Sequence, residues 1–305
     1  MKEDVCAVLD FGSNTVTLAV YRVGFHDFRL LLKQKATLGI IRFINDGILS
    51  EDGILRAVST ITELKQAAES MTKRVFCFAT ASLRGVDNAQ SVITRIRQES
   101  GIDIDLLSGE KEAYYDYLGL MQHLPGIRNA VALDIGGGSM EIIHIRNGRL
   151  HQCISLPTGS LKLSIEYADG RFPHSEECTH IEEYVYNLLE RVDWLEQTHS
   201  DTIYTIGGTA RAVTKLHKAI FSYSMDSKGY SYPVSDLGPL LLYLEDEAHY
   251  QRLEQIIPDR MQTIVPGMIA LKTVARKAGC RQAVLSKYGV REGYLLGKTL
   301  LGGRS

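Results

Sequence analysis

Three turns in this sequence carry the residue types of a phosphate site. In the central turn, the apolar residues 130–133 lead to Asp134, which is followed by the glycines 136–138 and by Ser139. Because glycine lacks a Cβ atom, main-chain N–H groups can approach phosphate oxygens closely, and an acid at the strand end can hold a divalent cation beside them. This stretch therefore predicts a site for phosphate and a metal ion.

The same chemistry recurs near the start, where Asp10 is followed by a glycine, Ser13 and Asn14. A third glycine turn, at 207–209, follows a strand-like run and opens a predicted helix, so its amides would point at an anion. A flexible hairpin is the alternative for residues 136–138, since glycine after a strand is often plain turn chemistry. That alternative does not explain why an acid precedes two of the turns. The predicted phosphate-binding residues are Ser13, Asn14, Gly136, Gly137, Gly138, Ser139, Gly207, Gly208 and Thr209.

The composition is that of a globular protein with two domains. A chain of 305 residues exceeds the usual size of one hydrophobic core, and 45% hydrophobic with 23% charged residues carries no signature of disorder. The net charge of -2 predicts no general attraction to nucleic acid. The five cysteines include no Cys-x-x-Cys pair, which favours buried, reduced thiols. No apolar run reaches membrane-spanning length and no leader is recognisable, so we expect a cytoplasmic protein without a membrane partner.

The order of predicted elements repeats along the chain. Each half begins with three strands and continues with alternating helices and strands. The predicted leading strands are 5–11, 15–23 and 28–38 in the first half and 129–134, 140–146 and 149–156 in the second. The break at Pro125-Gly126 gives domains of 1–124 and 125–305. Two such halves predict a duplicated α/β domain with a cleft between its halves.

The second half also carries several predicted helices and one predicted loop. Helical spacing of apolar residues favours a long helix over 176–198, and a segment rich in Ser, Tyr and Gly favours a surface loop over 222–235, for which a substrate lid is the alternative. The other predicted helices are 159–167, 209–219, 235–256, 259–278 and 290–301.

Eight motifs spread over nearly the whole chain resemble those of the exopolyphosphatase and guanosine pentaphosphate phosphohydrolase (Ppx/GppA) family, within the actin-like ATPase superfamily. They are 10–15 (DFGSNT), 79–84 (ATASLR), 108–113 (SGEKEA), 134–141 (DIGGGSME), 156–160 (LPTGS), 206–210 (IGGTA), 264–267 (IVPG) and 288–293 (YGVREG). Sugar kinases and actin lack the Ser-Gly-x-x-Glu-Ala element. The resemblance implies duplicated actin-like (ribonuclease H-like) domains, each a mixed β-sheet flanked by helices, with an interdomain cleft. The last helix, 290–301, is expected to pack back on the N-terminal domain.

The resemblance also implies an enzyme: a Mg²⁺-dependent phosphoanhydride hydrolase that releases orthophosphate from the end of inorganic polyphosphate, with guanosine pentaphosphate (pppGpp) as a possible substrate. In the family, the glutamate that matches Glu112 activates water, and the arginine that matches Arg84 steadies the phosphate. This is sensible chemistry, because a carboxylate can take the proton of water while cations and amides spread the transition-state charge. Asp134, with Glu141 and Asp10 as neighbours, is the expected ligand of Mg²⁺.

Departures from the family pattern leave other hypotheses open. Thr17 stands where an arginine is frequent and Lys111 where an acid is usual, which motivates a polyphosphate- or nucleotide-binding regulator with little turnover. A sugar kinase would need an acceptor-side aspartate, and no motif supplies one. Outside the resemblance, Glu112 has a simpler explanation, because acids in the first turn of a helix complement its dipole. The chain resembles the short family members, so we expect a groove for long polyphosphate to come from a homodimer or to be absent.

Overall fold

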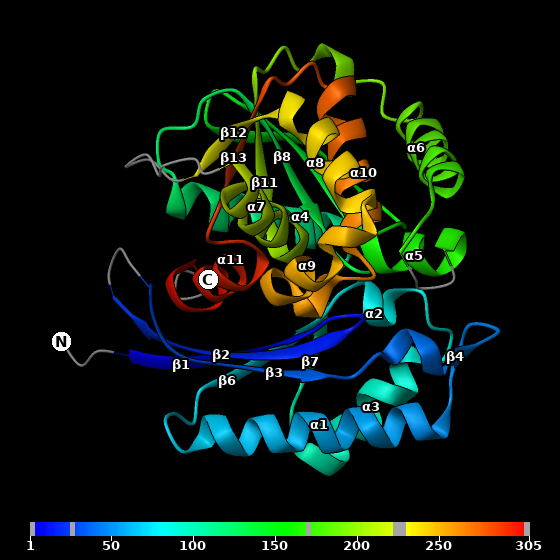
Figure 1. Cartoon of the computed structure of the whole chain (residues 1–305). Coiled ribbons are helices and arrows are strands. Elements are labelled where there is room, and N and C mark those ends of the chain that lie inside the picture. Colours follow the sequence, from blue (N-terminus) through cyan, green and yellow to red (C-terminus); the bar gives the residue numbers. More distant parts are fainter. Residues whose placement is uncertain (1–3, 25–27, 169–171, 222–229, 302–305) are drawn as a thin grey trace. The chain divides into compact units, whose positions relative to one another are not determined.

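The computed structural model describes residues 4–24, 28–168, 172–221 and 230–301. The chain divides into two compact units, Met1–Glu112 and Ala113–Ser305. The division falls inside helix α4 (Gly109–His123), ahead of the boundary predicted at Pro125-Gly126. Each unit holds one large mixed sheet with helices packed on it (Figure 1), so the predicted fold class is confirmed.

In the first unit, the described residues form a five-stranded sheet with the order β3-β2-β1-β6-β7. Its strands are β1 (Asp4–Phe11), β2 (Thr15–Val23), β3 (Phe28–Thr37), β6 (Val75–Ala79) and β7 (Ile104–Leu106). The first three strands are antiparallel neighbours, and β6 and β7 extend the sheet in parallel with β1. The expected leading strands are therefore present.

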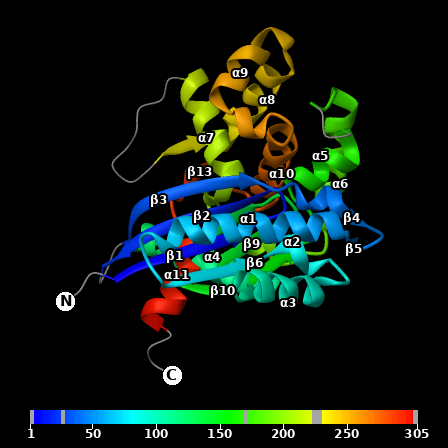
Figure 2. The same ribbon diagram turned by 90° about the horizontal axis from the view of Figure 1, so that it is seen from below.

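Helices cover one face of this sheet. They are α1 (Glu51–Glu69), α2 (Ala81–Arg84) and α3 (Ala89–Ser100), with a short 3-10 turn η1 (Ile40–Phe43) and the small strands β4 (Ile44–Asn45) and β5 (Ile48–Leu49) before α1. Ser50 caps α1 by accepting from the main-chain N–H of Gly53, as expected for a helix start. Ile54 and Ile61 of α1 are buried in one cluster with Leu9 of β1. Figure 2 shows α1 lying over the strands with α3 beside it.

The second unit repeats this plan with one added strand. Its described residues form a six-stranded sheet in the order β10-β9-β8-β11-β13-β12. The strands are β8 (Ala130–Ile135), β9 (Met140–Arg146), β10 (Arg149–Leu156), β11 (Thr202–Ile206), β12 (Ser231–Pro233) and β13 (Gln282–Leu285). Again the three leading strands are antiparallel, and β11 and β13 continue in parallel with β8. The shared order supports a duplication.

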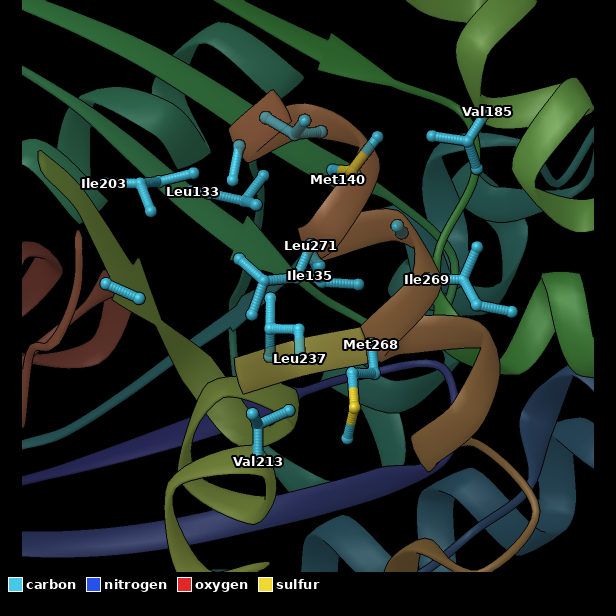
Figure 3. Packing of buried hydrophobic residues seen from close by; sticks show 14 of the residues in the cluster. Leu133, Ile135, Met140, Val185, Ile203, Val213, Leu237, Met268, Ile269 and Leu271 are labelled. Atoms are coloured by element: carbon cyan, nitrogen blue, oxygen red, sulfur yellow. The ribbon is translucent and has the colours of Figure 1, made fainter. Parts of the chain in front are cut away.

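The helices of the second unit pack on both faces of its sheet. Besides α4 they are α5 (Ser160–Ala168), α6 (Ser175–Leu189), α7 (Gly207–Phe221), α8 (Leu237–Glu245), α9 (Tyr250–Ile256), α10 (Ile264–Lys277) and α11 (Val290–Leu296), which runs into a π-helical turn (Gly297–Leu301). Figure 3 shows the core on one face, where Leu133 and Ile135 of β8 meet Met268 and Leu271 of α10. Burying each such side chain stabilises the unit by about 1.5–3 kcal/mol.

Three predicted segments differ from the structure. The helix expected over 176–198 ends at Leu189, although Val192 and Leu195 continue into the core through turns. The helix expected over 235–256 is interrupted, because Asp246 is extended and its side chain caps the next turn by accepting from Ala248 N–H. The helix expected from 259 begins only at Ile264.

The loop expected over 222–235 also differs in its described part. Residues 222–229 lie outside the described residues, and Ser231–Pro233 form β12, which pairs antiparallel with β13. The proposal of a substrate lid in this loop falls on the residues that are not described.

The five cysteines are unpaired, and burial raises the pKa of Cys6 and of Cys178 to about 11, so both thiols stay protonated at neutral pH. Among the described helices, none combines the length and the apolar character that crossing a bilayer requires.

Candidate active site

The first unit brings Arg84 and Glu112 into direct contact. Arg84 is the last residue of α2, which starts directly after β6, and Glu112 lies in the first turn of α4. The Arg84 guanidinium donates to Glu112 Oε2 at 2.5 Å and to the main-chain oxygen of Leu107 at 3.2 Å. The side chains are 20% and 10% exposed, respectively, so this ion pair is largely shielded from water. Sequence reasoning singled out both residues, and the fold places them together.

Local capping explains why Glu112 is held in place. Ser108 precedes α4 and caps it, because its hydroxyl accepts from Lys111 N–H and its carbonyl from Glu112 N–H. Breaking a shielded ion pair by removing one partner leaves an uncompensated charge, which is strongly destabilising. The pair therefore presents a carboxylate of fixed position beside a guanidinium, a combination suited to a general base next to a phosphate contact.

The first acid-glycine turn lies at the same sheet edge as Arg84. Strands β1 and β6 are parallel, Phe11 pairs with Ala79, and the Ser82 hydroxyl of α2 donates to the Phe11 carbonyl. The turn closes through a hydrogen bond from Gly12 N–H to the Thr15 carbonyl.

The end of β3 holds this turn in place. The carbonyl of Asn14 accepts hydrogen bonds from Leu38 N–H and Gly39 N–H, both at 2.9 Å. Ser13 is 8% exposed, and Asp10 stands one residue before the end of β1. The predicted residues of this unit thus gather at the carboxyl ends of its parallel strands, where ligands of α/β sheets bind.

In the second unit, helix α5 orients the central glycine turn. The turn is a tight β-hairpin closed by Gly136 N–H donating to the Ser139 carbonyl. The carbonyl of Gly136 accepts from Ser160 N–H at 2.9 Å, and the carbonyl of Gly137 accepts from the first amides of α5 at 3.0 and 3.1 Å. In a planar trans peptide the C=O and the following N–H point in opposite directions. Since α5 binds the two carbonyls, the N–H groups of Gly137 and Gly138 point to the opposite side of the turn. Main-chain N–H groups that point to one side in this way can bind an anion.

Gly159 makes this close contact feasible. A Cβ atom at Gly159 would stand 2.6 Å from the carbonyl oxygen of Gly136 and from the carbonyl carbon of Gly137. Only glycine fits such an approach of helix to turn. Sequence reasoning did not place Gly159 in the site, although the motif at 156–160 was the available signal.

The two predicted acids of the second unit face each other across neighbouring strands. Asp134 of β8 pairs directly with Glu141 of β9. They are 9% and 1% exposed, respectively. Side chains directly opposite in an antiparallel pair lie on one face with Cβ atoms about 5 Å apart, and two like charges there are destabilising unless a cation lies near. The pair therefore has the character of a cation site.

The third glycine turn is part of α7, which begins at Gly207. Gly207 has a φ of +83°, and a Cβ atom there would overlap the Asp134 carboxylate, while one at Gly208 would overlap the Arg260 guanidinium. The Thr209 hydroxyl donates to the Ile135 carbonyl at 2.8 Å and so fixes α7 on β8. These glycines let two charged side chains lie against the start of the helix.

Two arginines that sequence reasoning missed, Arg211 and Arg260, interact electrostatically with Asp134. Burial lowers the pKa of Arg211, and Arg291 lowers it further, while Asp134 and Glu292 act in the opposite direction. Burial likewise lowers the pKa of Arg260, and the Asp134 carboxylate opposes this shift. Arginine keeps its charge in proteins, so this part of the second unit is a cationic environment that favours phosphate. No spacing in the sequence could connect these arginines to Asp134.

The pair of acids, Asp134 and Glu141, suits a Mg²⁺ site that is completed by water and phosphate oxygens. Within the described residues, no three His, Cys, Asp or Glu side chains gather to hold a metal ion. Mg²⁺ is usually bound by one or two carboxylates together with waters and substrate phosphates. Asp134 and Glu141 meet that requirement within one unit, and Asp10 belongs to the other unit.

The fold and the site define a duplicated α/β protein with an acid-glycine turn in each unit. The sequence matches the model of the Ppx/GppA phosphatase family over residues 19–301. The chain belongs to the Ppx/GppA phosphatase family.

Individual relatives agree with this assignment. The chain is 27% identical to "Exopolyphosphatase 1" of Mycobacterium tuberculosis over 300 residues, which cover 95% of this chain and 87% of that protein. It is 23% identical to "Guanosine-5'-triphosphate,3'-diphosphate pyrophosphatase" of Photobacterium profundum over 294 residues, which cover 94% of this chain and 58% of that protein.

Solved structures show the same fold. An exopolyphosphatase from Cytophaga hutchinsonii superposes with a TM-score of 0.85 at 22% identity, and the Aquifex aeolicus member of the Ppx/GppA family with a TM-score of 0.80 at 23% identity. In both cases the match covers 99% of each chain.

Proposed function

We propose that this protein is an exopolyphosphatase that hydrolyses the terminal phosphoanhydride bond of inorganic polyphosphate and releases orthophosphate, with pppGpp as a second substrate. Its membership of a phosphatase family and the names of two relatives that align along nearly its whole length support the proposal. The observation that carries it is the shielded pair of Glu112 and Arg84, because a hydrolase needs a placed base beside a phosphate contact.

In the proposed reaction the oxygen of water attacks the terminal phosphorus. The bond from that phosphorus to the bridging oxygen breaks, and the shortened chain leaves with the bridging oxygen. Glu112 takes the proton of the attacking water, and Arg84 binds oxygens of the transferred phosphate. The main-chain N–H groups of the glycine turns donate hydrogen bonds to the other phosphate oxygens and stabilise their negative charge. Placement and electrostatic stabilisation of this kind supply most of the catalysis in phosphoryl transfer.

Mg²⁺ is the proposed cofactor, held by Asp134 and Glu141, with Asp10 as a further predicted ligand. The buried acid pair supports this assignment, since two opposed carboxylates favour a cation. When bound, the ion would neutralise charge on the phosphate oxygens. Arg211 and Arg260, which interact electrostatically with Asp134, would also stabilise the negative charge of the phosphate oxygens.

Orthophosphate release tests the function. Purified protein with Mg²⁺ is offered long polyphosphate, short polyphosphate, pppGpp and ATP at equal concentrations of terminal phosphate. We expect release from polyphosphate or pppGpp in preference to ATP. Binding of these compounds without any release would instead support the regulator hypothesis.

A cytoplasmic location and a homodimer belong to the same proposal. Cell fractionation tests the location, and light scattering on the purified protein tests the dimer.

A further inference from the structure

A third strand contributes to the row of residues that contains the acid pair. Ser155 of β10 pairs with Glu141 of β9, which pairs with Asp134 of β8. The Ser155 hydroxyl donates to Glu141 Oε1 at 2.7 Å. The three residues therefore lie side by side on one face of the second sheet, and a hydrogen bond connects the outer one to the central carboxylate.

The next row of residues on the same face of the sheet is apolar. Two residues earlier on β10 is Cys153, which pairs with Ile143. Ile143 belongs to the apolar cluster on this face, and Cys153 packs against that cluster. The face is therefore apolar until the row of Ser155, where it becomes polar. The Ser155 hydroxyl is partly buried, and its hydrogen-bond partner here is a carboxylate.

The hydrogen bond restricts a side chain that would otherwise have several conformations. Glutamate has three rotatable side-chain bonds, and Glu141 is 1% exposed. A charge-assisted O–H···O⁻ bond is short and about twice as strong as a neutral one. It can therefore fix the plane of the carboxylate against the repulsion of Asp134 opposite.

We propose that Ser155 is a positioning residue for the metal site, which orients Glu141 so that this carboxylate and Asp134 bind one Mg²⁺. The inference rests on the proposed function, in which these two acids hold the cation. Residues that hydrogen-bond a metal ligand typically change metal affinity by 10–100-fold when they are replaced.

Mn²⁺ binding to the intact protein tests this inference without any turnover. Free Mn²⁺ is followed by its EPR signal during titration of wild type, Ser155→Ala, Ser155→Thr and Glu141→Gln, with Mg²⁺ as competitor. Ser164→Ala is the control, because the Ser164 hydroxyl, in a fully buried residue, donates to the main-chain carbonyl of Gln262 and not to a carboxylate. Thermal unfolding of each variant checks that the fold is kept.

We expect Ser155→Ala to weaken Mn²⁺ binding by about 10-fold and Ser155→Thr, which keeps the hydroxyl, to bind nearly as wild type. Ser164→Ala should bind as wild type. If Glu141→Gln weakens binding while Ser155→Ala does not, the role of Ser155 is refuted and the metal site stands. If Glu141→Gln also leaves Mn²⁺ binding unchanged, both the metal site and the role of Ser155 are refuted, whereas orthophosphate release by the wild type would still support the hydrolase.

Discussion

The two units share a strand order and differ in what stands opposite their acids. In the first unit Asp10 pairs with Thr17, which pairs with Lys35 on the third strand. In the second unit the corresponding acid, Asp134, pairs with Glu141. The first row thus combines one acid with a hydroxyl and a lysine, whereas the second row has two opposed acids. Only the second row therefore places two carboxylates next to each other, which is the donor set proposed for the cation.

The units also differ in the groups that they could offer to a phosphate. The first contributes the shielded pair of Arg84 and Glu112, and the second contributes a glycine turn whose carbonyls are bound by α5. In the proposed site, the base belongs to one copy of the fold and the two opposed metal ligands belong to the other.

Replacement of the base should have the largest effect. Glu112→Gln keeps the shape of the side chain but cannot take a proton, so we expect turnover to fall by about 10²–10⁴-fold with polyphosphate binding largely kept. Steady-state kinetics and equilibrium binding measure the two quantities. Glu110→Gln is the control, because Glu110 lies in the same helical turn but is exposed. Equal losses in both variants would count against a special role for Glu112.

Replacement of the two acids should have unequal effects on metal dependence. We expect Asp134→Asn to raise the Mg²⁺ concentration needed for half-maximal activity by about 10–100-fold, since it removes one of two opposed carboxylates. Asp10→Asn should raise it less, because its row already contains Lys35. Metal titration of activity measures both. An equal or larger effect of Asp10→Asn would overturn the proposed division of the site.

Replacement of Gly159 should loosen the glycine turn of the second unit. In Gly159→Ala the new Cβ atom would clash with the carbonyls of Gly136 and Gly137, so we expect a loss of about 1–3 kcal/mol in the free energy of unfolding and weaker phosphate binding. Denaturant unfolding measures the first quantity. Gly238→Ala is the control, because open space surrounds Gly238 in α8 and alanine should there be neutral or stabilising. An unchanged free energy of unfolding in Gly159→Ala would show that the close contact between Gly159 and the turn is not required for stability.

Acid should weaken the second unit slightly. Burial lowers the pKa of His144, which stacks on Trp194, below its unfolded value near 6.5. As pH falls through that value, the unfolded chain binds the proton first, so stability that is present at pH 7 is lost on acidification. His144→Phe keeps an aromatic ring there, and its melting temperature should fall less than that of wild type between pH 7 and 5. The exposed His180, replaced by Gln, is the control; an unchanged pH profile in His144→Phe would refute the assignment.

Much of the fold follows from local patterns in the sequence. The predicted leading strands of both sheets are present, and Ser50 and Ser108 cap the starts of α1 and α4. These signals are readable because strand pairing and capping depend on near neighbours. The prediction of one continuous helix over 235–256 was wrong, because Asp246 is extended and its side chain caps a new turn.

The site was less accessible to sequence reasoning than the fold. The acids and glycines could be predicted because they stand at the ends of strands. The register of β8 and β9 could not be predicted, and this register places Glu141 opposite Asp134. Arg260 approaches Gly208 from a distant segment, so no spacing predicts that contact. Long-range packing of this kind is fixed by the tertiary structure.

The central claim is that water attacks the terminal phosphorus of the chain, and hydrolysis in H₂¹⁸O tests it most directly. Polyphosphate is digested with the purified protein and Mg²⁺, and the released orthophosphate and the shortened chains are analysed by mass spectrometry. We predict one ¹⁸O atom in each released orthophosphate and none in the shortened chains. Label in the shortened chains, or orthophosphate without label, would contradict the claim.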